Sequence, residues 1–153
     1  MATQYIELSG QINGNMSSYV IERLREELDT RFTKGLRDTH ILILGISYKK
    51  NIEDVRESPS LVIFELLKNR QAIVDYYDSH VVEIPELEDH KSLAGLKSID
   101  LTKEQLKKYD AVIVCTDHDN IDCNFVVENS KLVIDTRNAI NYLSTKNDHV
   151  VKA

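Results

Sequence analysis

Three positive charges, Lys49, Lys50 and Arg56, stand close together in residues 45–60, GISYKKNIEDVRESPS. The strand-like run HILIL (40–44) precedes this segment, and the helix-like run SLVIFELL follows it. Ligands of α/β proteins bind outside the carboxyl ends of parallel strands, where a connection usually needs only two to six residues. The extra length and the cations predict a site for an anion such as phosphate, with lysine as a point charge and arginine as a bidentate donor.

The start of the following helix supports this hypothesis. Ser58 is placed to cap the helix and Pro59 suits its first position. A helix N-terminus adds its own positive potential to such a site. The alternative is a solvated loop whose cations form salt bridges with the acidic side chains of the same segment, Glu53, Asp54 and Glu57.

Arg137 is a second cation expected at this edge of the sheet. It follows the apolar run LVID, which ends at Asp135. Because parallel strands deliver their carboxyl ends to one edge, we expect Arg137 to lie near the loop after the first strand. The alternative for Arg137 is a salt bridge with Asp135 or Asp117.

A self-contained dinucleotide site is not indicated. Asp78 ends the second expected strand, where the acidic residue of such a site belongs. The glycines are missing, since Gly45 is followed by Ile46, Ser47 and Tyr48 rather than by the pattern GxGxxG.

Nucleophilic and metal chemistry are also weakly supported. Cys115 lies within an apolar strand, which favours core packing over a nucleophilic role despite the nearby His118. Asp117 and His118 fit either a pocket lining or a surface turn. The histidines His80 and His90 lack metal-ligand spacing on a regular element, so we expect no metal site.

The elements that position these residues alternate between strand and helix. Val20, Leu24, Leu28 and Phe32 predict an amphipathic helix over 15–32, after an irregular start broken by glycines. We expect four strands at 40–46, 72–77, 111–115 and 132–135, helices at 59–69 and 102–109, a short one within 119–129, and a weakly patterned tail. Consecutive apolar residues in the first and third strands are typical of a parallel sheet covered on both faces. The predicted fold is α/β, doubly wound and mostly parallel, an incomplete Rossmann-like sheet preceded by a long amphipathic helix.

Composition narrows the functional classes. The 153 residues carry a net charge of −6, which disfavours general nucleic-acid binding. No apolar run approaches the roughly 20 residues that span a bilayer, so no membrane partner is expected. The N-terminus lacks the features of a secretory signal, and the two cysteines are not arranged as CxxC. We therefore expect a reducing, cytoplasmic setting.

The segment GISYKKNIEDVRESP resembles the signature G-x-(A/S)-(F/Y)-K-x4-D-x-R-E-S-P of the UDP-glucose/GDP-mannose dehydrogenase family, at the start of its C-terminal domain. QYIELSGQINGNMSSYVIERL, VDYYDSHVVEIP, AVIVCTDH and VIDTRN are similar to further segments of that family. The resemblance covers about residues 5–140 and is greatest to the UDP-N-acetylhexosamine 6-dehydrogenase branch.

This resemblance implies an NAD-dependent enzyme of polysaccharide biosynthesis that oxidises C6 of a UDP-sugar to a carboxylate. It implies that Tyr48, Lys49 and Arg137 contact the UDP-sugar substrate and that Arg56 reaches the NAD cofactor. It also implies a homodimer in the full-length enzyme, with N-terminal Rossmann and central domains as partners. On this basis residues 1–37 are the end of the central connector, 38–145 the UDP-sugar-binding domain and 146–153 a tail.

The chain departs from the family in lacking the GxGxxG pattern and the segment around the catalytic cysteine, so we expect no catalytic residue in it and no turnover by it alone. Ser79 also replaces the usual proline after Asp78. Two alternatives remain open: a separate nucleotide- or phosphate-binding module without catalysis, and a receiver-like or partner-binding α/β domain with no small ligand. The receiver-like domain is disfavoured because Gly45, Ile46 and Ser47 stand where its acidic cluster belongs.

Overall fold

The centre of the molecule is a sheet of five parallel strands in the order β2-β1-β3-β4-β5. The computed structural model describes residues 2–49, 51–56, 58–140 and 148–153, with the side chains of the first helix from Met16 onward. The strands are β1 (His40–Leu44), β2 (Ile73–Tyr77), β3 (Ala111–Val114), β4 (Val133–Asp135) and β5 (Val150–Lys152). The predicted doubly wound α/β class is confirmed.

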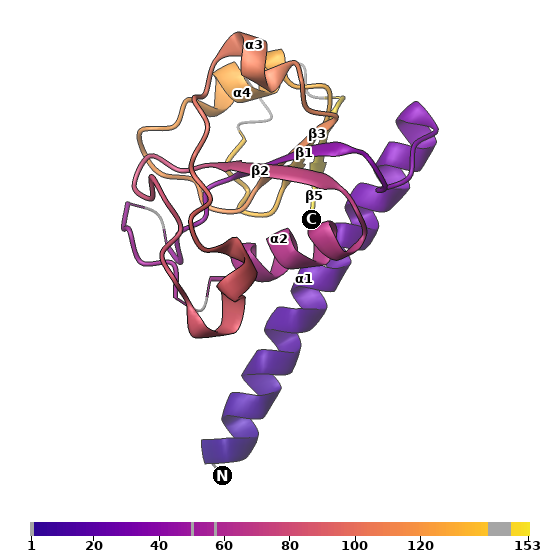
Figure 1. The fold of residues 1–153 in the computed structure, drawn as a ribbon. Coiled ribbons are helices and arrows are strands. Elements are labelled where there is room, and N and C mark those ends of the chain that lie inside the picture. Colours follow the sequence, from indigo (N-terminus) through magenta and orange to yellow (C-terminus); the bar gives the residue numbers. More distant parts are fainter. Residues whose placement is uncertain (1, 50, 57, 141–147) are drawn as a thin grey trace.

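Helices cover both faces of this sheet (Figure 1). The long α1 (Ala2–Phe32) and α2 (Pro59–Asn69) pack together on one face, and the short α3 (Lys103–Leu106) and α4 (Cys123–Asn129) lie on the other. A 3-10 helix, η1 (Glu88–Leu93), follows β2.

Successive residues of β1 belong to different apolar clusters. Ile41 and Ile43 are buried in the cluster that contains α1 and α2, and Leu42 and Leu44 in the cluster that contains α3 and α4. This alternation explains why β1 is apolar at consecutive positions, since both faces of the strand are covered.

Helix α1 is longer than the sequence predicted. Its stripe of Val20, Leu24 and Leu28 is buried as expected, but the helix begins at Ala2 rather than near residue 15. An isolated glycine in a helix costs only about 1 kcal/mol, so Gly10 and Gly14 do not interrupt α1. The helix ends at Phe32 as expected, and Thr33 follows it in the left-handed conformation, at φ 56°.

The expectation of four strands was wrong, because Val150–Lys152 forms β5 beside β4. The strand lies within the expected tail, and its three residues are too few for a visible alternation. The division of the chain at residues 37 and 145 stays a prediction, and residues 141–147 lie outside the described ones.

The connection from β1 to α2 follows its predicted capping. The Oγ atom of Ser58 accepts a hydrogen bond from the backbone N–H of Ser60 at 3.3 Å, and Pro59 occupies the first helical position. Among the residues that the structure describes, no helix is long and apolar enough to cross a membrane.

Candidate functional site

The carboxyl ends of the strands bring four loops to one edge of the sheet. Leu44 pairs in register with Tyr77 and Val114, and Val114 with Asp135. The residues that come next are therefore neighbours at this edge: Gly45, Asp78, Cys115 and Thr136. Strands β1 and β3 are adjacent, and their following helices, α2 and α4, lie on opposite faces. The strand order therefore reverses between β1 and β3, and doubly wound sheets bind ligands at such a switch point.

Gly45 lets the loop after β1 pass close to the loop after β3. Its φ is +84°, and a Cβ atom there would overlap the carbonyl oxygen and Cβ of Thr116. The Oγ1 of Thr116 in turn donates a hydrogen bond to the carbonyl oxygen of Ser47 at 2.8 Å. Gly45 thus serves close packing between two protein segments rather than approach to a cofactor.

Asp78 holds the first residues of the same loop. Its Oδ2 accepts the backbone N–H groups of Ile46 (2.8 Å) and Ser47 (3.0 Å), and its Oδ1 accepts the N–H of His80 (2.7 Å). Burial alone would raise the pKa of Asp78, but these N–H groups and His118 outweigh it and hold the pKa below its usual value. Because its oxygens face protein donors, Asp78 is not available for the ribose of a dinucleotide, and it does not combine with Gly45 into an NAD site.

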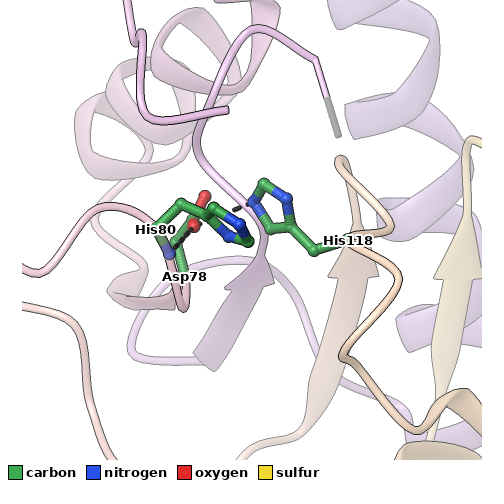
Figure 2. A group of neighbouring side chains, drawn as sticks. All are labelled: Asp78, His80 and His118. Carbon is green, nitrogen blue, oxygen red and sulfur yellow. Dashed lines mark hydrogen bonds and ion pairs between the residues drawn. The ribbon is translucent and has the colours of Figure 1, made fainter. Parts of the chain in front are cut away.

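His118 lies fully buried between Asp78 and the loop after β1 (Figure 2). Its Nδ1 is 2.6 Å from the backbone nitrogen of Asn51, which can only donate, so Nδ1 must accept. Its Nε2 is 2.9 Å from Asp78 Oδ1 and 3.0 Å from Ser47 Oγ. These partners assign the neutral tautomer with the proton on Nε2.

This tautomer bears on the possibility of a metal. Asp78, His80 and His118 each offer a ligand atom, and these atoms lie within 4.8 Å of one another. The rings of His80 and His118 are stacked, with centroids 4.2 Å apart (Figure 2). A histidine that binds a metal almost always donates its other ring N–H to a carbonyl or carboxylate. In His118 that other nitrogen accepts a hydrogen bond instead, so the arrangement favours a proton rather than a metal on Nε2.

The side chain of Asn51 forms a second connection between the two loops. Its Nδ2 donates to Asp119 Oδ2 at 2.7 Å, and its Oδ1 accepts the backbone N–H of Asp119 at 2.9 Å. Asn51 has a φ of 64°, a conformation that asparagine tolerates better than most residues. We refer to the contacts of Asn51 with His118 and Asp119 as the loop clasp.

Tyr48 and Lys49 lie in the segment that the clasp closes. Tyr48 is 42% exposed, and the Lys49 ammonium lies 5.7 Å from the centre of its ring. Their backbones are held: the Tyr48 N–H donates to the carbonyl oxygen of Asp54, and Ser47 Oγ donates to the carbonyl oxygen of Lys49. Both residues are exposed beside this fixed backbone.

Arg56 forms a salt bridge within its own loop, as the alternative of a solvated loop predicted. Its side chain is 78% exposed and forms a bidentate pair with the carboxylate of Asp54, in which both hydrogen bonds are 3.1 Å long. These bonds lower the pKa of Asp54. The expected contact of Arg56 with NAD stays a prediction, and Lys50 and Glu57 lie outside the described residues.

Arg137 borders a cavity of about 350 Å³ between α1, the start of α2 and the sheet edge. Its Nε donates to the carbonyl oxygen of Cys115 at 2.6 Å, and neither of the salt bridges considered for it is formed. Asp135 accepts backbone N–H groups instead, those of Arg137, Ala139 and Ile140. No described residue accepts a hydrogen bond from the two terminal nitrogens of the guanidinium, so these remain for a ligand.

The other walls of this cavity are mostly apolar. Met16, Tyr19 and Val20 come from α1, Pro59, Ser60 and Ile63 from α2, and Cys115, Thr136 and Ala153 from the sheet edge. An aromatic or aliphatic group with a phosphate or carboxylate beside it would suit such a lining. The thiol of Cys115 is buried, which raises its pKa to about 12 and agrees with core packing rather than with a nucleophilic role.

The assignment of Tyr48, Lys49 and Arg137 to a ligand stays a prediction, and the sequence did not indicate the groups that organise the loop. Asp78 was considered only as a ribose ligand, and His118 only beside a nucleophile, in a pocket lining or in a turn. The polar run that follows the apolar strand β3, TDHD, was the available signal. Its partners come from a loop about 70 residues earlier, which no local pattern reveals.

Comparison with known proteins identifies the class. Residues 42–142 match the family model described as "UDP-glucose/GDP-mannose dehydrogenase family, UDP binding domain". The chain therefore belongs to this family.

Individual relatives agree with this membership. A UDP-N-acetyl-D-mannosamine dehydrogenase from Methanococcus maripaludis is 31% identical over 149 residues, covering 91% of this chain and 31% of the relative. The structure of a UDP-D-ManNAc dehydrogenase from Pyrococcus horikoshii superposes with a TM-score of 0.73 at 23% identity over 96% of this chain and 32% of the other, which supports the fold. The structure of a UDP-glucose dehydrogenase from Pyrobaculum islandicum is 27% identical with a TM-score of 0.62, covering 82% and 27%. The chain spans about a third of the length of the curated relatives it matches.

Proposed function

We propose that this chain is the UDP-binding part of an NAD-dependent UDP-sugar 6-dehydrogenase. In that enzyme the C6 alcohol of a UDP-sugar is oxidised to a carboxylate, with NAD as hydride acceptor. The observation that carries the proposal is the common position of Tyr48, Lys49 and Arg137 at one sheet edge, in a chain whose residues 42–142 match the family's UDP binding domain.

The chemistry of these three residues suits a nucleoside diphosphate. Lys49 supplies a point charge for phosphate, and Arg137 presents terminal nitrogens whose Nε is already fixed by the carbonyl of Cys115. Tyr48 adds an exposed ring beside Lys49. Strands β1 and β4 are separated only by β3, so their ends lie about 10 Å apart, within the reach of one extended ligand.

The NAD cofactor belongs, in this proposal, mainly to another part of the enzyme. Within the described residues Gly45 and Asp78 serve the packing of the loop rather than a dinucleotide. Arg56, exposed at the outer side of the loop, is the residue we assign to contact the cofactor across the domain boundary. The Rossmann and central domains, and a second copy in a homodimer, complete the catalytic unit.

The names of the relatives support one substrate branch. Several are UDP-N-acetyl-D-mannosamine dehydrogenases, and one from Ralstonia nicotianae is an NDP-N-acetyl-D-galactosaminuronic acid dehydrogenase. We therefore propose a UDP-N-acetylhexosamine as substrate, in a cytoplasmic pathway that makes the acidic sugars of a polysaccharide.

Calorimetric titration of the chain with UDP tests the proposal. Lys49→Ala and Arg137→Ala each remove one charge-assisted contact, worth about 1.5–3 kcal/mol, and should raise the Kd for UDP about 10- to 150-fold. Lys131→Ala is the matched control, because it removes a cation just before β4, at the opposite edge of the sheet. Unchanged affinity in both site variants, or an equal loss in the control, would contradict the assignment.

Arg56→Ala separates the two ligands. If Arg56 serves the cofactor, this variant of the chain binds UDP within about threefold of the parent, whereas the same change in the complete dehydrogenase raises the KM for NAD. Loss of UDP affinity as large as that of Arg137→Ala would instead place Arg56 in the UDP site.

A further inference from the structure

We propose that His118 is a positioning residue whose Nδ1 holds the loop of Tyr48 and Lys49 in its ligand-binding conformation. This inference rests on the proposed UDP site and adds the group that shapes it. Its basis is the set of contacts that the buried His118 makes with Asp78 (Figure 2), with Ser47 and with the backbone of Asn51.

The two ring nitrogens of His118 have different hydrogen-bonding roles: one donates and the other accepts. Nε2–H donates toward Asp78 and Ser47, both buried at the base of the loop. Nδ1 accepts from the Asn51 backbone, two residues beyond Lys49. A neutral imidazole with one donor and one acceptor nitrogen satisfies both sides at once, which lysine, arginine or a carboxylate could not do.

The chain between these two points carries the ligand groups. Tyr48 and Lys49 lie between Ser47, which His118 contacts at one nitrogen, and Asn51, which it contacts at the other. Ser47 Oγ also donates to the carbonyl oxygen of Lys49 at 2.9 Å. Among the described residues of this stretch, Ser47, the carbonyl of Lys49 and the N–H of Asn51 are thus all held by contacts that lead back to one imidazole.

The surroundings keep His118 in this orientation. Its side chain is fully buried, and the ring of His80 stacks on it at 4.2 Å between centroids. The next residue, Asp119, closes the clasp by exchanging two hydrogen bonds with the Asn51 side chain. Because the ring is held on one face by His80 and at both nitrogens by hydrogen bonds, it can keep the attached loop in one position.

Two amide variants separate the two nitrogens. In His118→Asn the Oδ1 takes the place of Nδ1, so the Asn51 N–H keeps an acceptor while the contact with Asp78 is lost. In His118→Gln the Nε2 amide takes the place of the ring Nε2, so the contact with Asp78 is kept while the Asn51 N–H loses its acceptor. If His118 acts only in stability, both variants should lose UDP affinity in proportion to the stability they lose.

The first measurement needs no ligand. Amide hydrogen exchange of the chain, followed by NMR, should show a protected Asn51 N–H that stays protected in His118→Asn and exchanges at least tenfold faster in His118→Gln. In the parent chain, long-range proton–nitrogen correlation of the imidazole should show the Nε2–H tautomer. Retained protection of Asn51 in His118→Gln, or the opposite tautomer, would overturn the proposal.

The second measurement connects the clasp to the ligand. Calorimetry with UDP should give a Kd about five- to tenfold higher for His118→Gln than for His118→Asn, whatever the order of their melting temperatures. Equal losses that follow stability would refute a positioning role. If the parent chain does not bind UDP, the proposed function fails, whereas the exchange experiment still decides whether His118 holds the loop.

Discussion

Asp78 is the residue whose replacement most directly tests the account of the sheet edge. Its two oxygens accept three backbone N–H groups, from Ile46, Ser47 and His80, and lie 2.9 Å from the Nε2 of His118. The substitution Asp78→Asn keeps the size of the side chain but removes the charge and replaces one oxygen by an NH₂ group. Whichever way the amide is turned, that group faces donors rather than acceptors.

The expected loss of stability follows from these contacts. Hydrogen bonds to a charged group contribute about 1.5–3 kcal/mol each, and at least two of those made by Asp78 cannot form with the amide. Two such losses amount to about 3–6 kcal/mol. We therefore expect the free energy of unfolding to fall by about 3–6 kcal/mol, and the melting temperature by about 6–24 °C for a chain of this size.

Urea unfolding at neutral pH, followed by circular dichroism, measures this difference. The control is Asp100→Asn, an exposed aspartate for which a change within about 0.5 kcal/mol is expected. A loss below 1 kcal/mol for Asp78→Asn would refute the view that its contacts hold the loop to the core.

The pH dependence gives a second check on the same variant. The folded pKa of Asp78 lies below the value of 3.8 for a free aspartate, because the N–H groups and His118 outweigh its burial. A lowered folded pKa contributes stability that is fully present above the unfolded pKa and is lost as the pH falls through the folded value. The gap between parent and variant should thus be constant from pH 5 to 8 and should narrow only below about pH 4. A gap that narrows already between pH 7 and 5 would contradict this direction.

Three further predictions concern the same edge. Gly45→Ala should lower the free energy of unfolding by at least about 2 kcal/mol, because the added Cβ overlaps atoms of Thr116 and the residue keeps a positive φ. Urea unfolding measures this loss. The control is Gly35→Ala, where nothing lies within 4 Å of the added Cβ and a change below about 1 kcal/mol is expected. Burial raises the pKa of the Cys115 thiol to about 12, so Cys115 should resist a thiol reagent at pH 8 in the folded chain and react only after unfolding. The half-buried Cys123 should react before it, and mass spectrometry of labelled peptides measures the order. Ser58→Ala should destabilise the chain by about 1 kcal/mol through loss of the cap of α2, and a neutral result in thermal unfolding would show that the cap contributes nothing.

The framework of the fold was predictable where one local rule decides the structure. Strands β1 and β3 are apolar at consecutive positions because both faces are covered, and α2 begins where Ser58 and Pro59 predicted. The early part of α1 and strand β5 were missed for opposite reasons. Glycine suggested a break that the helix tolerates, and a three-residue strand is set by its pairing with β4 rather than by its own pattern.

The position of the candidate residues at the sheet edge was predictable, whereas the contacts between their loops were not. The order of strand and loop alone places Lys49 and Arg137 at the carboxyl edge of a parallel sheet. The partners of those loops depend on three-dimensional approach: Asp78 contacts a residue 32 positions earlier, and His118 one 67 positions earlier. A sequence pattern can assign residue types to an edge but cannot decide which donor meets which acceptor.

The buried polar network explains how a long loop can serve as a binding surface. A connection of 14 residues between β1 and α2 far exceeds the two to six that the topology needs, and its conformational freedom would reduce ligand affinity by the fraction of time spent in other conformations. An apolar contact would favour collapse onto the core without selecting one backbone path. Asp78 and His118 instead accept particular N–H groups of Ile46, Ser47 and Asn51, so they favour a backbone path that presents those groups. Tyr48 and Lys49 can then stay exposed for a ligand while the neighbouring backbone is held to the core.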